Sequence, residues 1–192
     1  MTDPLAKLFG SPARLKLLRL FLFNPLQSFT TEEAATRAQI DLSEARRQAG
    51  FLAGSGLLKR NHRGRELKYE VNNSFPYIRP LQDLLLNVES RAEELKDRLR
   101  PTGTIKLIIV SGVFMGEWES NIDLLVVGDK MKDKHFRSEI KKLEADIGKE
   151  IRYTLLTSQD FLYRLNMSDK LMRDIFDFPH KIIFDKFDIG LK

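Results

Sequence analysis

The pattern of apolar and polar positions in the first part of the chain predicts three short helices. They cover residues 12–23, 30 to about 37, and 43 to about 53. Each begins beside a side chain suited to an N-cap, namely Ser11, Thr30 and Ser43, and Glu33 completes a capping box with Thr30. Asn24-Pro25 ends the first helix, because proline cannot donate the next helical hydrogen bond.

A two-stranded hairpin is predicted after the third helix. Two extended runs cover residues 57–62 and 66–71, and Arg63-Gly64-Arg65 forms the turn between them. Apolar and polar side chains alternate along the second run, Leu67, Tyr69 and Val71 against Glu66, Lys68 and Glu70. One face of the hairpin is therefore expected to be buried and the other to be in water. The helices and the hairpin form a first domain over residues 1–75.

A long linker helix is predicted next, within residues 76–100. From residue 78 its apolar positions are three or four residues apart, at Ile78, Leu81, Leu85, Val88, Ala92, Leu95 and Leu99. This seam spans three heptads and can pair with a second copy of the chain or pack within one chain. Leu84 and Leu86 widen the stripe early, which favours packing of its first half on the N-terminal domain. We favour pairing of two chains along this seam, which would form a homodimer, over packing within one chain.

Residues 101–192 predict a second domain of alternating strands and helices, after a break at Pro101-Thr102-Gly103. Strands are expected at residues 105–110, 121–128, 150–156 and 181–184, and helices at 133–147, after the cap formed by Thr157 and Asp160, and at 169–177. The phenylalanines at 176, 178, 184 and 187 are assigned to the core. The fold class is α+β, with an α/β C-terminal domain.

Composition excludes several classes of protein. The chain has 192 residues, 42% hydrophobic and 31% charged, which is typical of a globular protein. No apolar run approaches the roughly 20 residues of a membrane-spanning helix, and no export signal opens the chain, so we expect a cytoplasmic protein without a membrane partner. Without cysteine, disulfides and thiolate zinc sites are excluded. His62, His135 and His180 are scattered, so we expect no metal and no cofactor.

The net charge of +5 is confined to the first half of the chain. Residues 1–100 carry 17 basic and 12 acidic side chains, whereas residues 101–192 carry 15 of each. This asymmetry favours one module that faces a polyanion. The alternative is a chance asymmetry on solvated faces.

Three helices followed by a basic hairpin resemble the winged helix-turn-helix DNA-binding domain over roughly residues 8–75. The Gly-Ser-Gly-Leu-Leu exit at residues 54–58 and the Arg-Gly-Arg tip at 63–65 share the order of that family. The resemblance implies that the third helix enters the major groove of double-stranded DNA and that the wing contacts the backbone or the minor groove. The groove-facing candidates are then Ser43, Glu44, Arg46, Arg47 and Gln48, and the wing candidates are Arg60, Arg63, Arg65 and Lys68.

These residue types suit that role for physical reasons. Lys and Arg neutralise phosphates and release counterions, and Arg and Gln can also donate hydrogen bonds to base edges. From residue 59 to 68 there are five basic side chains and one acid, Glu66. The alternative is a wing that packs on a neighbouring domain or a protein partner, with its arginines in water.

The segment 103–160 resembles the minimal nucleotidyltransferase domain of the polymerase beta superfamily. The small-residue turn Ser111-Gly112 and the run Ser120-Asn121-Ile122-Asp123 carry the resemblance. In that family a Gly-Ser turn precedes an Asp-x-Asp pair, and a third carboxylate comes from a later strand. The carboxylates hold two metal ions, which clamp the attacking and leaving oxygens of nucleotidyl transfer.

This chain departs from the family at the carboxylates. Asn121 stands at the first position, Asp123 is retained, and the third strand offers only Glu150 at its start. One negative charge binds divalent cations weakly, so we predict an inactive domain with no catalytic residue. A retained pocket would serve a nucleotide-like small ligand or protein docking, and its lining is Ser111, Gly112, Ser120, Asn121 and Asp123.

Two further features near this pocket have two interpretations each. Gly112 and Gly116 suit a close approach to a phosphate or ordinary turns. Trp118 suits stacking on a base or a role as a buried anchor.

The sequence therefore favours a DNA-binding transcriptional regulator that is not an enzyme, with a nucleotidyltransferase-like domain for sensing or assembly. The alternative is an active Mg²⁺-dependent nucleotidyltransferase that acts on a nucleic acid or a protein and depends on Asp123. A third hypothesis is an adaptor whose winged domain binds protein.

Overall fold

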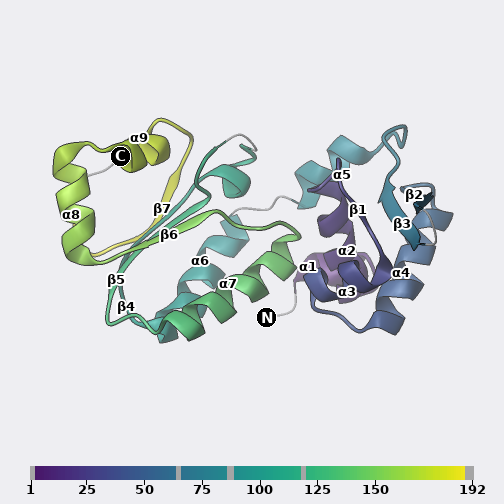
Figure 1. Cartoon of the computed structure of the whole chain (residues 1–192), viewed down its shortest axis with the longest axis horizontal. Helices are drawn as coiled ribbons and strands as arrows, with labels where there is room; N and C mark the ends of the chain where they lie inside the picture. The colour runs from purple at the N-terminus through teal and green to yellow at the C-terminus, as the bar shows by residue number, and fades with distance from the viewer. Residues whose placement is uncertain (1–2, 64–65, 86–88, 118–119, 189–192) are drawn as a thin grey trace. The chain divides into compact units, whose positions relative to one another are not determined.

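A computed structural model describes residues 3–63, 66–85, 89–117 and 120–188 (Figure 1). The chain divides into two compact units. The first comprises Met1–Leu85 with Lys141–Glu150, and the second comprises Leu86–Ile140 with Ile151–Lys192. Within the described ranges, every helix is too short or too polar to cross a bilayer.

The first unit contains five helices and a three-stranded antiparallel sheet among its described residues before Leu85. Its elements are α1 (Pro4–Leu8), α2 (Pro12–Leu22), β1 (Ser28–Phe29), α3 (Thr31–Ala38), α4 (Leu42–Gly54), β2 (Leu58–Arg63), β3 (Glu66–Val71) and α5 (Ile78–Leu85). The strand order is β1-β3-β2, and all pairs are antiparallel. This is the order of helices and hairpin expected for a winged helix.

Capping side chains fix most of the helix starts. The Ser11 hydroxyl accepts from the Arg14 amide, and Thr30 and Glu33 form the expected capping box. The third helix differs from the prediction, because its N-cap is Asp41 and it begins at Leu42. Ser43 lies inside the first turn. The Asp41 side chain makes no capping hydrogen bond, so α4 starts two residues earlier than predicted without a side-chain cap.

The core of the first unit lies between α2, α4 and the hairpin. Leu17, Phe21 and Leu22 are fully buried, and the Phe21 and Phe29 rings meet edge to face at 5.6 Å. The predicted buried face of β3 is confirmed for Tyr69 and Val71, which are buried, but not for Leu67, which is exposed near the start of the strand. Burial of this face holds the hairpin in one register.

The predicted long helix is divided between the two units. Helix α5 belongs to the first unit, where the Gln82 amide donates to the Leu22 carbonyl at 2.6 Å and Leu85 is buried. Helix α6 (Glu89–Leu99) belongs to the second unit, where Leu95 and Leu99 are buried. The unit boundary therefore falls after Leu85, whereas the sequence suggested a separate linker over residues 76–100. Leu86 and Val88 lie outside the described residues.

The second unit is a four-stranded mixed sheet with helices. After η1 (Arg100–Thr102) come β4 (Thr104–Val110), η2 (Gly112–Met115), β5 (Leu124–Asp129), α7 (Asp133–Ile147), β6 (Tyr153–Leu156), α8 (Ser158–Met167), α9 (Lys170–Phe176) and β7 (Lys181–Asp185). Helix α7 crosses the unit boundary, because its residues from Lys141 on are assigned to the first unit. The strand order is β6-β5-β4-β7, with β5 and β6 parallel and the other pairs antiparallel. The unit combines helices with a sheet, as the α+β class predicts, and β5 and β6 each start three residues later than predicted.

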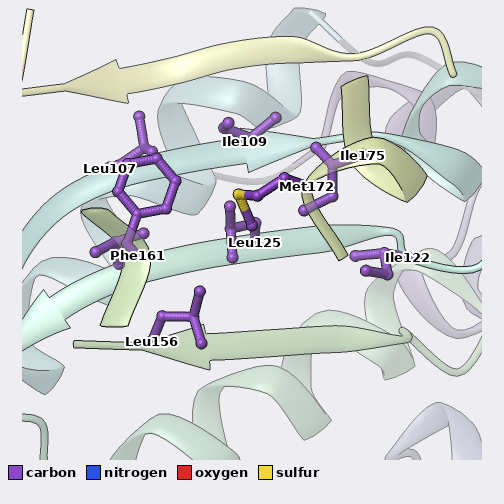
Figure 2. Close-up of a cluster of buried hydrophobic side chains, with 9 residues drawn as sticks. Leu107, Ile109, Ile122, Leu125, Leu156, Phe161, Met172 and Ile175 are labelled. Carbon is purple, nitrogen blue, oxygen red and sulfur yellow. The ribbon is translucent and has the colours of Figure 1, made fainter. Parts of the chain in front are cut away.

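One face of this sheet carries the core cluster in Figure 2, in which Leu107, Ile109 and Leu125 point toward Phe161 of α8 and Met172 of α9. Helices α6 and α7 lie on the other side of the sheet (Figure 1). Side chains on both faces of β4 and β5 are buried, which is why these strands read as continuous apolar runs. The aromatic tail joins this core in part, since Phe176 and Phe187 pack against the cluster.

Candidate nucleic-acid interface

Helix α4 presents a polar outer face. Ser43, Arg46 and Arg47 are exposed, and the exposed fractions of the two arginine side chains are 61% and 71%. Ala45, Ala49 and Leu52 occupy the opposite face and are buried. The helix is thereby anchored by its apolar side with both guanidinium groups directed into solvent.

Each arginine has a carboxylate partner within the same unit. Arg46 Nη2 lies 2.8 Å from Glu32 Oε1, and Arg47 Nη2 lies 2.6 Å from Glu44 Oε2. The hydrogen bond from Arg46 is the main cause that lowers the pKa of the Glu32 carboxyl below its ordinary value. Exposed ion pairs contribute little to stability, because water screens the attraction between the charges. Both arginines can therefore exchange their carboxylate for a phosphate at little cost.

Gln48 differs from the expectation that it faces a groove, because its side chain is buried. Its amide oxygen accepts from Arg14 Nε at 2.8 Å, and its amide nitrogen donates to Glu44 Oε1 at 2.8 Å. Hydrogen bonds from Gln48 and then Arg47 lower the pKa of Glu44. Gln48 follows Ala45 by three residues and so lies on the inward side of the helix. It positions α4 against α2.

The hairpin adds two exposed cations. Lys59 and Arg60 on β2 are exposed, and neither forms an ion pair with a described residue. Lys68 is mostly buried and lies 3.7 Å from Glu33 and 3.8 Å from Glu66, so its charge is offset by two carboxylates. The Arg63 side chain and all of Arg65 lie outside the part of the chain that the structure describes.

Three residues of this surface were missed by sequence reasoning. Glu32 is the partner of Arg46, and Arg14 stacks over the Phe51 ring at 3.8 Å while bonding Gln48. Neither has a local signal, because each partner lies more than ten positions away along the chain. Lys59 had a signal, since it opens the basic run of the hairpin.

In the second unit, Asp123 is fully buried and its carboxylate is saturated. Oδ1 accepts from the Val113 amide at 2.8 Å and from Arg152 Nη2 at 2.9 Å. Oδ2 accepts from the Arg152 amide at 2.8 Å and from Arg152 Nε at 2.9 Å. The hydrogen bond to Asp123 raises the pKa of Arg152. Arg152, the lone cation of an apolar segment, was not recognised as this partner from the sequence.

The backbone at Gly112 is fitted to this arrangement. Gly112 has φ +51°, and a Cβ atom there would clash with the Asp123 carboxylate. Glycine is therefore required by close packing and by backbone conformation. Gly116 ends η2 with φ 79°, which is ordinary turn geometry. Trp118 lies outside the described residues.

The other predicted pocket residues do not converge on a common point. The buried hydroxyls of Ser111 and Ser120 donate to the Pro179 and Ile122 carbonyls at 2.9 and 2.8 Å. Asn121 is exposed. Both Asn121 and Asp123 precede the start of β5, so strand alternation does not align their side chains.

These residues do not fit the metal pair of the nucleotidyltransferase family. The lone pairs of Asp123 are used by N–H donors, and its charge is balanced by Arg152. Among the described residues, no group of three or more His, Asp or Glu side chains is placed to hold a metal ion.

Comparisons with known proteins add one structural likeness. No family model and no curated protein sequence matches the chain. The chain is similar to the solution structure of a homodimeric winged helix-turn-helix DNA-binding domain from Mycobacterium bovis, described as a possible ArsR-family transcriptional regulator. The identity is 20%, the match covers 49% of this chain and 89% of that chain, and the TM-score is 0.30.

Proposed function

We propose that the chain is a DNA-binding transcriptional regulator whose first unit binds double-stranded DNA. The observation that carries the proposal is the outer face of α4, where Arg46 and Arg47 are exposed on a helix anchored by its opposite side. An α-helix fits the major groove, and arginine can bind guanine there or a phosphate beside it. Ser43 lies next to them at the start of the helix, and Glu44 orients Arg47.

The hairpin supplies the backbone contacts in this proposal. Lys59 and Arg60 are exposed cations on β2, and they belong to the same basic run of the sequence as Arg63 and Arg65. Their contacts with phosphates would add affinity without sequence preference. Lys68 would contribute only after release from Glu33 and Glu66.

The second unit has a non-catalytic role in this proposal. The saturated Asp123 carboxylate opposes the alternative of an active Mg²⁺-dependent nucleotidyltransferase. Three of the five pocket residues use their side-chain polar atoms within the chain, which leaves the exposed Asn121 as the side-chain contact for a nucleotide-like ligand. Of the two candidate roles of the second unit, we therefore favour assembly of the protein over ligand sensing.

The experiment that tests the proposal selects bound duplexes from a random pool with the full chain at two salt concentrations. We expect an enriched sequence, and we expect Arg47→Ala to weaken binding and relax preference at one or two positions. Loss of one bidentate base contact costs about 1–3 kcal/mol. Arg60→Ala should weaken binding to all duplexes alike.

Arg173→Ala is the matched control, because Arg173 is exposed and lies in the second unit. Retardation of no duplex at low salt would contradict the proposal and favour the protein-binding adaptor.

A further inference from the structure

A second basic surface lies at the start of α7, in the second unit. It comprises Lys130, Lys132, Lys134 and Arg137, which we call the α7 basic surface. All four side chains are exposed, and none forms an ion pair with a described residue. Lys134 and Arg137 are three residues apart and so neighbour each other on the helix. Lys130 and Lys132 extend the surface into the preceding turn.

The turn that carries these lysines is firmly held. The Met131 side chain fills a gap left by two glycines: a Cβ at Gly103 would clash with the Met131 sulfur, and one at Gly128 would lie 2.8 Å from it. The Lys132 amide donates to the Thr102 carbonyl at 2.7 Å. With the turn fixed from inside, the lysines have ordered backbones and free side chains.

Nearby described acids form no ion pair with the four cations of this surface. Asp129 accepts from the Ser158 hydroxyl at 2.6 Å and from the Ser158 amide at 3.1 Å, so it is bound within the unit. Glu139 faces His135 on another flank of α7, at 3.8 Å. Asp133 lies in the first turn of the helix, where the helix dipole favours a negative charge. Within residues 130–140, four cations stand against the two acids Asp133 and Glu139.

The chemistry of this surface suits a phosphate backbone. None of the exposed large hydrophobic side chains lies within residues 130–140. Helices that bind a bilayer surface insert large apolar side chains, so a lipid surface is disfavoured. Flexible cations spread along a helix and a turn suit repeated phosphates, which are contacted without sequence readout.

We infer that the α7 basic surface binds the phosphate backbone of nucleic acid and gives the chain a second, sequence-independent contact. The inference rests on the proposed function, because the polyanion is the DNA that the first unit binds. It assigns the second unit a direct part in DNA affinity.

The test compares the full chain with a triple variant, K132Q/K134Q/R137Q. Binding to a long mixed-sequence duplex is measured by fluorescence anisotropy over a series of salt concentrations. Each lost phosphate contact lowers the slope of log K against log salt by about 0.9. We therefore expect the slope to fall by up to about 2.7, with the melting temperature unchanged.

The matched control is K170Q/R173Q/K181Q, which removes two lysines and one arginine that are also exposed in the second unit. It changes the net charge equally and should keep the wild-type slope. Equal slopes in all three proteins, or an equal fall in both variants, would overturn the inference and leave the proposed function standing.

Two other outcomes also decide the matter. If the wild-type chain binds no duplex, the proposed function fails and the inference fails with it. If the triple variant keeps the DNA slope but loses binding to phosphatidylserine vesicles, the surface is directed to lipid and the inference is overturned.

Discussion

At the scale of single residues, Asp123 shows that hydrogen-bonding partners decide which ligands a side chain can bind. In sequence it matches a metal-binding aspartate, and the loss of the neighbouring carboxylate at Asn121 is plain. Its burial and its four bonds to Val113 and Arg152 come from segments 10 and 29 positions away. Such pairings depend on how the strands assemble. The sequence therefore predicted that Asp123 would not hold a metal pair, but it did not predict which groups bind its carboxylate.

Removing the Arg152 guanidinium should destabilise the chain strongly. Arg152→Gln leaves a buried charge on Asp123 without its counter-ion, and breaking a buried pair costs about 3–5 kcal/mol. The matched control is Arg164→Gln, because the Arg152 and Arg164 side chains are each 42% exposed. Their partners differ, since Asp169, the partner of Arg164, is 27% exposed and Asp123 is not exposed at all. The control should cost less than about 1 kcal/mol. Urea unfolding measures both, and equal losses would contradict the assigned role.

The carboxyl of Glu32 should report DNA binding. The hydrogen bond from Arg46 is the first cause that lowers the pKa of Glu32 in the free chain. If Arg46 moves to a phosphate or a base, that pKa rises toward 4.5, its ordinary value. Arg46→Ala should produce the same rise without DNA.

Carboxyl NMR titration with and without duplex measures this shift. Because the pKa of Glu32 is depressed in the folded chain, the pair stabilises the fold above the ordinary pKa and is lost as pH falls through the lowered value. A pKa for Glu32 that is unchanged at DNA saturation would show that Arg46 stays bound to Glu32 of α3.

At the scale of elements, the sequence predicted the winged-helix order because its signals are local. Capping side chains and the alternation of β3 involve neighbours along the chain. The long helix was predicted less accurately, because a heptad pattern of apolar residues does not indicate which unit buries them. Leu85 is covered in the first unit, and Leu95 and Leu99 are covered in the second.

The homodimer prediction now depends on the part of α5 that remains exposed. Leu84 of α5 is 46% exposed, and Tyr77 in the turn just before α5 is 61% exposed. If this face pairs two chains, Leu84→Glu should weaken the dimer at least tenfold, since burying a leucine contributes about 1.5–3 kcal/mol. Sedimentation velocity over a dilution series measures the dissociation constant.

Leu162→Glu is the control for this measurement, because Leu162 is 41% exposed on α8. A wild-type chain that is monomeric at every concentration would contradict the dimer. A dimer lost only in Leu162→Glu would place the interface on α8.

At the scale of the whole molecule, average charge conceals local surfaces. The second half of the chain is neutral, with 15 basic and 15 acidic residues, yet Lys130, Lys132, Lys134 and Arg137 gather at one end of α7. The acids that balance them, such as Asp129, are bound elsewhere. Composition by halves therefore favoured a polyanion-facing module in the first half and gave no indication of the α7 basic surface in the second.

Magnesium should leave the stability of the whole chain unchanged. A ligand that binds only the folded state stabilises it by RT ln(1 + [L]/Kd) and so raises the melting temperature. Since Asp123 is saturated by N–H donors, millimolar MgCl₂ should shift the melting temperature by less than about 1 °C from that in NaCl of equal ionic strength. A rise of several degrees, abolished by Asp123→Asn, would revive the nucleotidyltransferase alternative.

The Asp123–Arg152 pair also limits how a cation site could be engineered at this position. Asn121→Asp alone would add an exposed acid, while the Asp123 carboxylate would stay occupied by Arg152 and the Val113 amide. Replacement of Arg152 alone would leave a buried charge before any cation could bind. An engineered site therefore needs simultaneous changes at both positions.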